Sequence, residues 1–148
     1  MNHSGTQRLE TERLILRRFV NEDALSMYQN WAADKEVTKY LTWPPHPNQE
    51  VSRKVVEDWV KAYDSKNYYH WAIIPKEKGE PVGSITVVHM NEEISMAHIG
   101  YCIGKTWWNN GITSEACKAV MDFLFDIVNV NRIEARHDPR NPNSGKVM

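Results

Sequence analysis

A short polar loop joins a β-type run to a helical run in the last third of the chain. Residues 101–103 end the β-type run, and Gly111 stands directly before a helical pattern that begins at Ile112. The first turn of a helix presents backbone N–H groups that have no partner within the helix, and such groups bind anions such as a pyrophosphate. The junction therefore predicts an anion site over residues 109–114.

Three residues of this loop have types suited to that task. Gly111 can adopt backbone angles closed to other residues and lets a phosphate approach the main chain closely. Thr113 or Ser114 can cap the helix with a hydroxyl while neighbouring N–H groups face the ligand. The plainer alternative for Gly111 is an ordinary turn between a strand and a helix.

The composition is ordinary for a water-soluble globular protein. The chain has 148 residues, of which 41% are hydrophobic and 25% are charged, and its net charge is −1. This balance argues against a nucleic-acid partner, which favours a basic surface. No apolar run approaches the roughly 18 residues of a membrane span, and the first residues lack a signal-peptide core. Two cysteines on separate elements fit a reducing compartment. We expect one cytoplasmic domain over residues 1–148.

The pattern of apolar residues predicts alternating strands and helices. Apolar, β-branched and aromatic runs indicate strands, and apolar residues that recur every three or four positions indicate helices. Asn21 and Asn48 stand where helix N-caps are expected, the latter opening a helix with an apolar stripe from Val51 to Tyr63, and Gly83 suggests a bulge. The predicted strands are residues 14–19, 68–74, 82–90, 94–103 and 132–136, and the predicted helices begin at residues 21, 48 and 112.

The order of these elements predicts the class of the fold. The three middle strands form an antiparallel meander, and the last strand follows a strand–helix crossover, which makes it parallel to the strand before the helix. We therefore expect an α/β protein with a mixed, mostly antiparallel sheet and one parallel pair.

Four segments of the chain resemble the GNAT N-acetyltransferase family, specifically the branch that acetylates the N-termini of ribosomal proteins. The family's loop signature is Gln/Arg-x-x-Gly-x-Gly/Ala, in which Trp108 holds the first position, Gly111 the glycine and Thr113 the last small residue. An alternative for Trp108 and its neighbour Trp107 is that they cover the edge of the core. The matched segments are residues 11–17, 99–101, 108–116 and 141–144.

The resemblance implies the GNAT fold, with a parallel strand pair that splays apart, and acetyl-coenzyme A as the cosubstrate. The pyrophosphate of the cosubstrate would lie on the loop, and its pantetheine arm would run beside the preceding strand. Asn141 and Ser144 match positions that contact the cosubstrate in relatives, although a turn and a helix N-cap are their plainer roles. The implied binding residues are Tyr101, Cys102, Ile103, Trp108, Asn109, Asn110, Gly111, Ile112, Thr113, Ser114, Asn141 and Ser144.

The resemblance also implies direct attack of an amine on the thioester, without a protein nucleophile or a metal. The thioester oxygen would accept a hydrogen bond from the backbone N–H of Ile103. His98 stands where many relatives carry a glutamate, and histidine can accept a proton near neutral pH; the alternative is a strand histidine satisfied by a backbone carbonyl. Cys102 and Cys117 are expected to be small apolar side chains. His46, beside prolines, is expected in a surface loop, with the acceptor entrance as the alternative.

The leading function is acetyl transfer to a protein N-terminal amine, with a ribosomal protein as the suggested acceptor. A polyamine or aminoglycoside acetyltransferase is the near alternative, and a non-catalytic acetyl-coenzyme A-binding module is the alternative of another class. Relatives continue with two more strands after the helix that begins near Ser144, whereas this sequence stops at Met148. We therefore expect either a fragment or a second polypeptide that covers the open sheet edge at residues 132–136.

Overall fold

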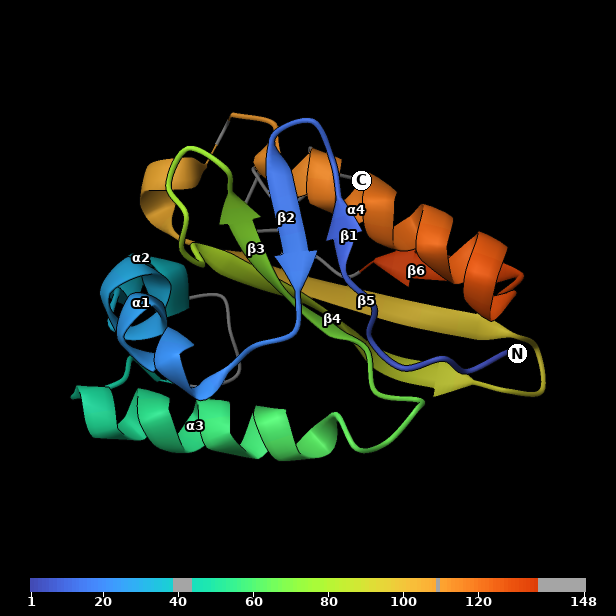
Figure 1. Ribbon diagram of the computed structural model, residues 1–148, viewed down its shortest axis with the longest axis horizontal. Coiled ribbons are helices and arrows are strands. Elements are labelled where there is room, and N and C mark those ends of the chain that lie inside the picture. Colours follow the sequence, from blue (N-terminus) through green and yellow to red (C-terminus); the bar gives the residue numbers. More distant parts are fainter. Residues whose placement is uncertain (39–43, 109, 136–148) are drawn as a thin grey trace.

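The computed structural model describes residues 1–38, 44–108 and 110–135, and within them six strands form one sheet. Each strand lies beside its neighbours in the chain, so the order across the sheet runs from β1 to β6 (Figure 1). The strands are β1 (Leu9–Glu10), β2 (Leu14–Arg17), β3 (His70–Pro75), β4 (Gly83–Asn91), β5 (Met96–Ile103) and β6 (Arg132–Ala135).

The directions of pairing confirm the mixed sheet. The pairs from β1–β2 through β4–β5 are antiparallel, whereas β5 and β6 are parallel, with Met96 opposite Arg132 and Ile99 opposite Ala135. The parallel direction arises because helix α4 (Ile112–Phe123) carries the chain back between these two strands. Strand β1 escaped prediction because two residues are too few to show a period.

Helices cover both faces of the sheet. In Figure 1, α1 (Ala24–Met27), α2 (Lys35–Thr38) and α3 (Gln49–Ala62) lie on one face, and α4 lies on the other. One π-helical turn, Tyr28–Ala32, continues α1, and another, Leu124–Val128, continues α4. All six residues of β3 are buried because this strand has helices on both faces.

Two groups of buried residues hold the layers together. The α4-side core joins the sheet to α4, and the α3-side core joins the sheet to α1 and α3. The α4-side core includes Leu14, Leu16, Tyr69, Trp71, Ile73, Ile85, Ala97, Ile99, Ala116, Val120, Phe123 and Leu124. The α3-side core includes Phe19, Met27, Trp31, Val37, Val56, Tyr63, Ala72 and Ile74.

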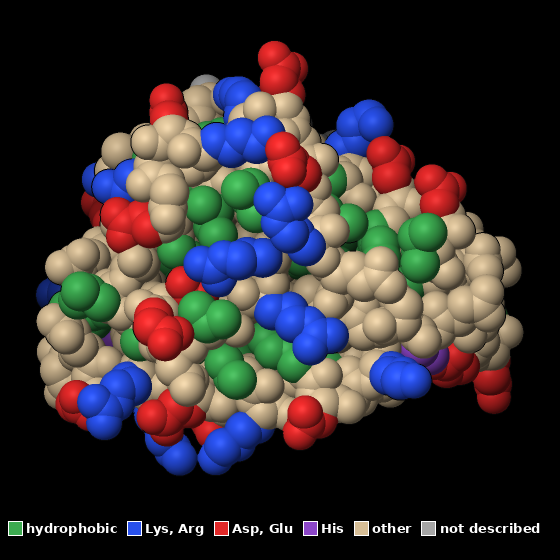
Figure 2. All heavy atoms as spheres, viewed as in Figure 1, with side chains coloured by type: hydrophobic (Ala, Val, Ile, Leu, Met, Phe, Trp, Pro, Cys, Tyr) green, Lys and Arg blue, Asp and Glu red, His purple; other side chains and the backbone are tan. Residues whose placement is uncertain are grey.

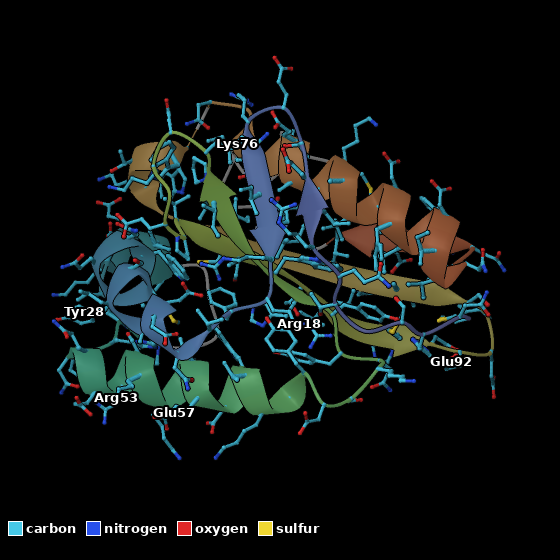
Figure 3. The ribbon with its side chains drawn as sticks, in the orientation of Figure 1. Arg18, Tyr28, Arg53, Glu57, Lys76 and Glu92 are labelled. Carbon is cyan, nitrogen blue, oxygen red and sulfur yellow. The ribbon has the colours of Figure 1, made fainter. Side chains whose placement is uncertain are left out.

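Helix α3 begins at the predicted cap. The side chain of Asn48 accepts a hydrogen bond from the N–H of Val51 at 3.2 Å, which satisfies one free amide of the first turn. The expected apolar stripe is only half-buried except at Tyr63, and the fully buried residues of the helix interior are Ser52 and Val56. The polar Arg53 and Glu57 project from the outer side of α3 (Figure 3).

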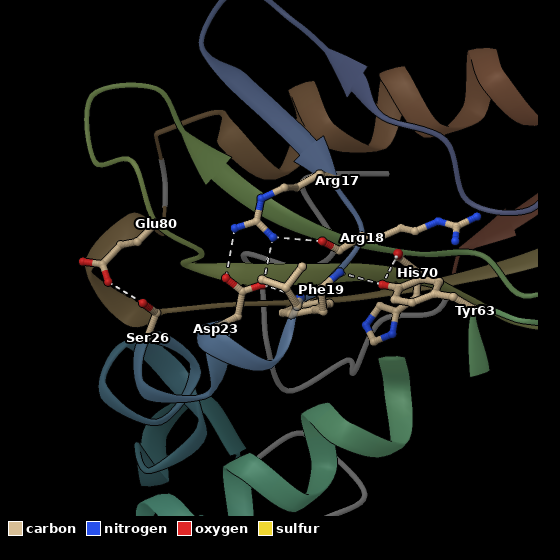
Figure 4. Close-up of polar contacts among 9 residues, drawn as sticks. Arg17, Arg18, Phe19, Asp23, Ser26, Tyr63, His70 and Glu80 are labelled. Atoms are coloured by element: carbon tan, nitrogen blue, oxygen red, sulfur yellow. Dashed lines mark hydrogen bonds and ion pairs between the residues drawn. The ribbon is translucent and has the colours of Figure 1, made fainter. Parts of the chain in front are cut away.

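The predicted N-cap at Asn21 is wrong. Asn21 is the first residue of a short 3-10 turn, and the preceding Val20 holds the cap position. The carboxylate of Asp23 accepts the Val20 N–H at 2.8 Å and also binds both terminal nitrogens of Arg17, at 2.8 and 2.9 Å (Figure 4). This hydrogen-bonded pair raises the pKa of the Arg17 guanidinium. A buried carboxylate that can reach back to the backbone displaces the asparagine as the cap.

The predicted bulge at Gly83 is also wrong. Gly83 pairs in register with Ile103, and the irregularity of β4 lies further on, where the register shifts between Val87 and His89. Val88 is exposed at this point, which fits an extra residue that lies outside the ladder.

The surface mixes both signs of charge. In Figure 2, lysine and arginine side chains alternate with acidic ones, and small hydrophobic areas lie between them. Across the described ranges, none of the helices is both long and apolar enough to pass through a bilayer.

Candidate functional site

The predicted anion site lies where β5 leads into α4. After Ile103 the chain makes a 3-10 turn, Lys105–Trp107, and α4 starts at Ile112. Gly111 occupies the N-cap position with φ +80°, a left-handed conformation that L side chains rarely adopt. The geometry of this turn therefore favours glycine at position 111.

The helix start differs from the prediction in its capping residue. The side-chain oxygen of Asn110 accepts the N–H of Ile112 at 3.2 Å, and neither Thr113 nor Ser114 caps the helix. A short asparagine side chain readily reaches the amide two residues ahead, and this local bond fixes the entry into the helix. The expectation of a hydroxyl cap at Thr113 or Ser114 is therefore corrected.

Several loop amides face no partner within the described residues. The Ile112 N–H is occupied by Asn110, but no acceptor is found there for the N–H groups of Gly111, Thr113 and Ser114. Gly111 and Ser114 are exposed, and Thr113 is half-buried. These donors lie at the positive end of α4, where an anion is favoured. Asn109, Asn141 and Ser144, which the sequence also suggested as binding residues, lie outside the described residues.

The end of β5 continues beyond its described pairing with β6. The N–H of Gly104 donates to the carbonyl of Val82 at 2.8 Å, beside β4. Because alternate residues of an antiparallel ladder point their backbone groups to opposite sides, the N–H of Ile103 is directed away from β4. The pairing of β5 with β6 covers Met96 to Ile99 in the described part of the chain, so β5 extends past it.

Trp108 closes the turn after this strand. Its indole Nε1 donates to the carbonyl of Ile103 at 3.0 Å, and its ring packs against both cores. Trp107 packs against the α4-side core. Both side chains therefore cover the edge of the core, as their alternative interpretation held, and Trp108 also fixes the strand end.

A second region, on β5 and β6, contains the predicted base. His98 is half-buried, and its flanking residues Ala97 and Ile99 belong to the α4-side core, so its side chain points to the opposite face. Its Nε2 contacts the carboxylate of Glu134, the residue directly across on β6. Glu134 also pairs with Arg132 at 2.6 Å.

This arrangement changes the interpretation of His98. The plainer alternative expected a backbone carbonyl as its partner, but the partner is a carboxylate. Sequence reasoning missed Glu134 because the strand–helix crossover predicts that β6 lies beside β5 without giving the register. The ring of His89 lies 5.9 Å from that of His98, so two imidazoles and one carboxylate gather on this face.

The two thiols are not suited to act as nucleophiles. Burial raises the pKa of Cys102 to about 12 and that of Cys117 to about 12, so both are protonated at neutral pH. Among the described residues, no group of three or more His, Cys, Asp or Glu side chains is placed to hold a metal ion.

His46 is buried, which corrects the expected surface loop. Its Nδ1 lies 2.6 Å from the hydroxyl of Ser52 on α3, and its backbone N–H donates to the carbonyl of Ala32 at 2.8 Å. Burial lowers the pKa of His46 below its usual value. The neighbouring prolines suggested that His46 is exposed, but its hydrogen bonds hold it against α3 and the π-helical turn after α1.

Comparisons with known proteins now define the family. The model of the acetyltransferase (GNAT) domain matches residues 13–148. The N-acetyltransferase p20 of Bacillus licheniformis is 35% identical over 95% of this chain and 78% of its own length. The ribosomal protein uS5-alanine N-acetyltransferase of Escherichia coli is 23% identical, over 95% of this chain and 75% of its own.

A comparison with solved structures supports the same family. A GNAT-family acetyltransferase from Bacillus anthracis has a TM-score of 0.81 with 26% identity, over 96% of this chain and 80% of the other. The strand order, the helices on both faces and the parallel β5–β6 pair are therefore those of a known acetyltransferase fold. The chain belongs to the GNAT acetyltransferase family and is an acyltransferase that uses acetyl-coenzyme A.

Proposed function

We propose that this protein transfers the acetyl group of acetyl-coenzyme A to the α-amine of a protein N-terminus. The observation that carries the proposal is the junction of β5 and α4, where loop amides without an acceptor among the described residues stand beside the end of β5, whose Ile103 N–H is directed away from β4. The sequence relationship to a ribosomal protein alanine N-acetyltransferase supports the class of acceptor, with a ribosomal protein as one candidate.

The residues of the junction fit the diphosphate and the pantetheine arm. The amides of Gly111, Thr113 and Ser114 can donate to phosphate oxygens, and Gly111 has no side chain to obstruct them. The pantetheine arm, which contains amides, can lie beside the end of β5, where the N–H of Ile103 is directed away from β4, as an added strand would. The Ile112 N–H contributes less, because Asn110 already occupies it.

The chemistry requires a neutral amine and a stabilised thioester oxygen. The amine nitrogen bonds to the acetyl carbon and loses a proton, the C–S bond breaks, and the leaving thiolate takes up a proton. The Ile103 N–H, turned away from β4, can donate to the oxygen on which negative charge develops. An α-amine, with a pKa of about 7.7–8.0 against about 10.4 for lysine, is easier to deprotonate.

His98 is the proposed base, with Glu134 as its positioning partner. A carboxylate bound to one ring nitrogen fixes the tautomer and leaves the other nitrogen to accept a proton. His98 precedes Ile103 by five residues, or about 17 Å along an extended strand, so proton transfer to His98 would need several water molecules in between. Cys102 and Cys117, both protonated, take no part.

The acceptor class can be tested by the release of coenzyme A. The matched probes are an alanine-initiated peptide with a free α-amine, the same peptide with a blocked α-amine and an internal lysine, and spermidine. We expect turnover with the first probe only. Faster turnover with spermidine would move the function to small amines, and tight coenzyme A binding without any turnover would favour a binding module.

A further inference from the structure

The turn between β1 and β2 contacts the start of α4, although about a hundred residues separate them in the chain. Arg13, in this turn, donates from Nη1 to the carbonyl of Asn110 at 3.0 Å and from Nε to the carboxylate of Glu115 at 2.7 Å. Its backbone N–H donates to the same carboxylate at 3.0 Å. One arginine therefore connects the loop before the helix with the first turn of the helix.

Hydrogen bonds within the turn and to the residue after β3 hold these contacts in place. The Thr11 N–H donates to the carbonyl of Leu14 at 2.9 Å, and the Leu14 N–H donates to the Thr11 hydroxyl at 3.0 Å. The carbonyl of Arg13 accepts the N–H of Lys76, at the end of β3, at 2.8 Å. The Thr11 hydroxyl also donates to Glu115.

Glu115 poses an electrostatic problem for an anion site. It lies in the first turn of α4, where an unpaired carboxylate would repel a diphosphate. Burial raises the pKa of Glu115, but the hydrogen bonds from Thr11 and Arg13 outweigh burial and lower it. The carboxylate is therefore ionised at neutral pH, and Arg13 neutralises its charge.

The remaining nitrogen of Arg13 lies over the glycine of the loop. Nη2 is 3.3 Å from the point where a Cβ on Gly111 would stand, and the described residues offer it no acceptor. The side chain of Arg13 is 48% exposed, so a ligand can reach it. The first position of the loop signature, where relatives carry Gln or Arg, is Trp108 here, and its indole is engaged with Ile103.

We propose that Arg13 binds the diphosphate of acetyl-coenzyme A through Nη2, while its other nitrogens hold Asn110 and Glu115. Arg13, in the β1–β2 turn, would supply the hydrogen-bond donor that Gln or Arg supplies in relatives at the position of Trp108. The assignment rests on the proposed position of the diphosphate at residues 109–114.

The test measures coenzyme A affinity by calorimetry for Arg13→Gln, Glu115→Gln and the double variant. Hydrogen bonds to charged groups predict a loss of roughly tenfold to a hundredfold for Arg13→Gln. The coenzyme A affinity of the double variant should stay low, because Arg13 contacts the ligand in addition to its contact with Glu115. Recovery of normal affinity in the double variant would overturn the direct contact, as would unchanged affinity in Arg13→Gln.

Two further measurements exclude a purely structural role. Arg13→Gln should reduce the salt dependence of coenzyme A binding, because one charge facing the phosphates is removed, and it should lower kcat/KM for acetyl-coenzyme A more than kcat/KM for S-acetylpantetheine, which lacks the diphosphate. Arg8→Gln is the matched control, since Arg8 pairs with Glu10 at 3.2 Å beside the same turn and contacts no loop residue in the described structure. An unchanged salt slope, or equal losses with both substrates, would overturn the proposal.

Two more variants distinguish a folding defect from an error in the proposed site. Arg13→Lys keeps the charge but loses the planar fork, and we expect intermediate affinity with normal thermal stability. If Gly111→Val weakens coenzyme A binding but Arg13→Gln does not, only the role of Arg13 is wrong. If neither substitution weakens binding, the proposed site at residues 109–114 is wrong as well.

Discussion

The two faces of the sheet are held together by different physical means. On the α4 face, the loop that begins the helix is tied down by charged, half-exposed groups, Arg13 and Glu115. On the α3 face, Tyr63 makes its hydrogen bonds between buried, neutral groups: it accepts the N–H of Phe19 at 2.9 Å and donates to the carbonyl of His70 at 2.8 Å (Figure 4). The first arrangement leaves donors for an anion, whereas the groups bound to Tyr63 are occupied and buried.

The difference separates binding from stability. Substitutions at the charged loop should change affinity for the cosubstrate while the fold survives, because that region is at the surface and its contacts are few. Substitutions or protonation within the α3-side core should change the free energy of unfolding, because a buried polar group that loses its partner there cannot form a hydrogen bond with water instead.

The largest effect is expected at His70 on a shift to acid. Its ring is buried against Trp59 and Phe19, at centroid distances of 4.4 and 5.0 Å, and burial lowers its pKa to about 3. Unfolded chains take up a proton below about pH 6.5, whereas the native state does so only near pH 3, so stability is complete above pH 6.5 and falls as the pH drops through this window. The loss should reach about 4 kcal/mol at pH 3.

Urea unfolding at several pH values measures this loss. In His70→Gln, which can keep the hydrogen bond to Tyr68 (2.8 Å in the native protein), the decline between pH 6.5 and pH 3 should be much shallower. His46→Gln is the companion variant, because burial lowers the pKa of His46 in the same direction. Equal slopes in the native protein and in His70→Gln would show that His70 does not control the acid response.

Sequence patterns predicted the class of sheet, the crossover and the loop, because each leaves a strong local signal. Asn48 capped its helix as expected, since its short side chain meets a free amide and no competitor lies nearby. Asn21 failed because the Asp23 carboxylate reaches the same backbone from inside the turn. Several side chains near a helix start can compete for the same backbone amide. Which of them caps the helix depends on their positions in the folded structure, which the sequence does not show.

The contacts between distant segments were invisible for a related reason. Arg13 with Glu115, and His98 with Glu134, are pairs whose partners are fixed by strand register and helix placement. Sequence marked residues 11–17 as a matched segment but gave no reason for Arg13 itself. The expectation that a further polypeptide covers the edge at β6 stays a prediction, as do the roles of Asn141 and Ser144, because residues 136–148 lie outside the described part.

The next largest effect is expected for Gly111→Val. A β-branched residue is strained at φ +80°, and its Cβ would lie 3.3 Å from Nη2 of Arg13, so the loop must rearrange. We expect affinity for coenzyme A to fall by about a hundredfold or more, from loss of several oriented donors of about 1 kcal/mol each. Equilibrium binding measures the effect.

Gly79→Val provides a matched control for that substitution. Gly79 has nearly the same backbone angle, φ +74°, but no atom lies within 4 Å of its added Cβ. Both variants should lose about 1–2 kcal/mol of stability from the left-handed conformation, and only Gly111→Val should lose affinity. Similar affinity losses in the two variants would mean that the loop has no special part in binding.

A smaller effect is expected when the proposed base is removed. His98→Ala should lower kcat/KM for an α-amine peptide by about tenfold at pH 7, where roughly a tenth of a free α-amine is already neutral. The deficit should shrink toward pH 9, because the acceptor then needs no base. Coenzyme A affinity should not change. A pH profile parallel to that of the native enzyme would remove His98 from the mechanism.

The smallest effect is expected for Glu134→Gln, which tests whether Glu134 does more than orient the ring of His98. The amide can still contact His98 Nε2, so the ring keeps its place, but the negative charge beside the imidazole is removed. We expect a loss of about threefold in kcat, of the size of one weak ionic contact, with KM unchanged. Glu134→Ala, which also frees the ring, should lose more, and the difference between the two variants separates charge from orientation. If Glu134→Ala matches the native kcat, the carboxylate only pairs with Arg132, and His98 must be positioned by the strand itself.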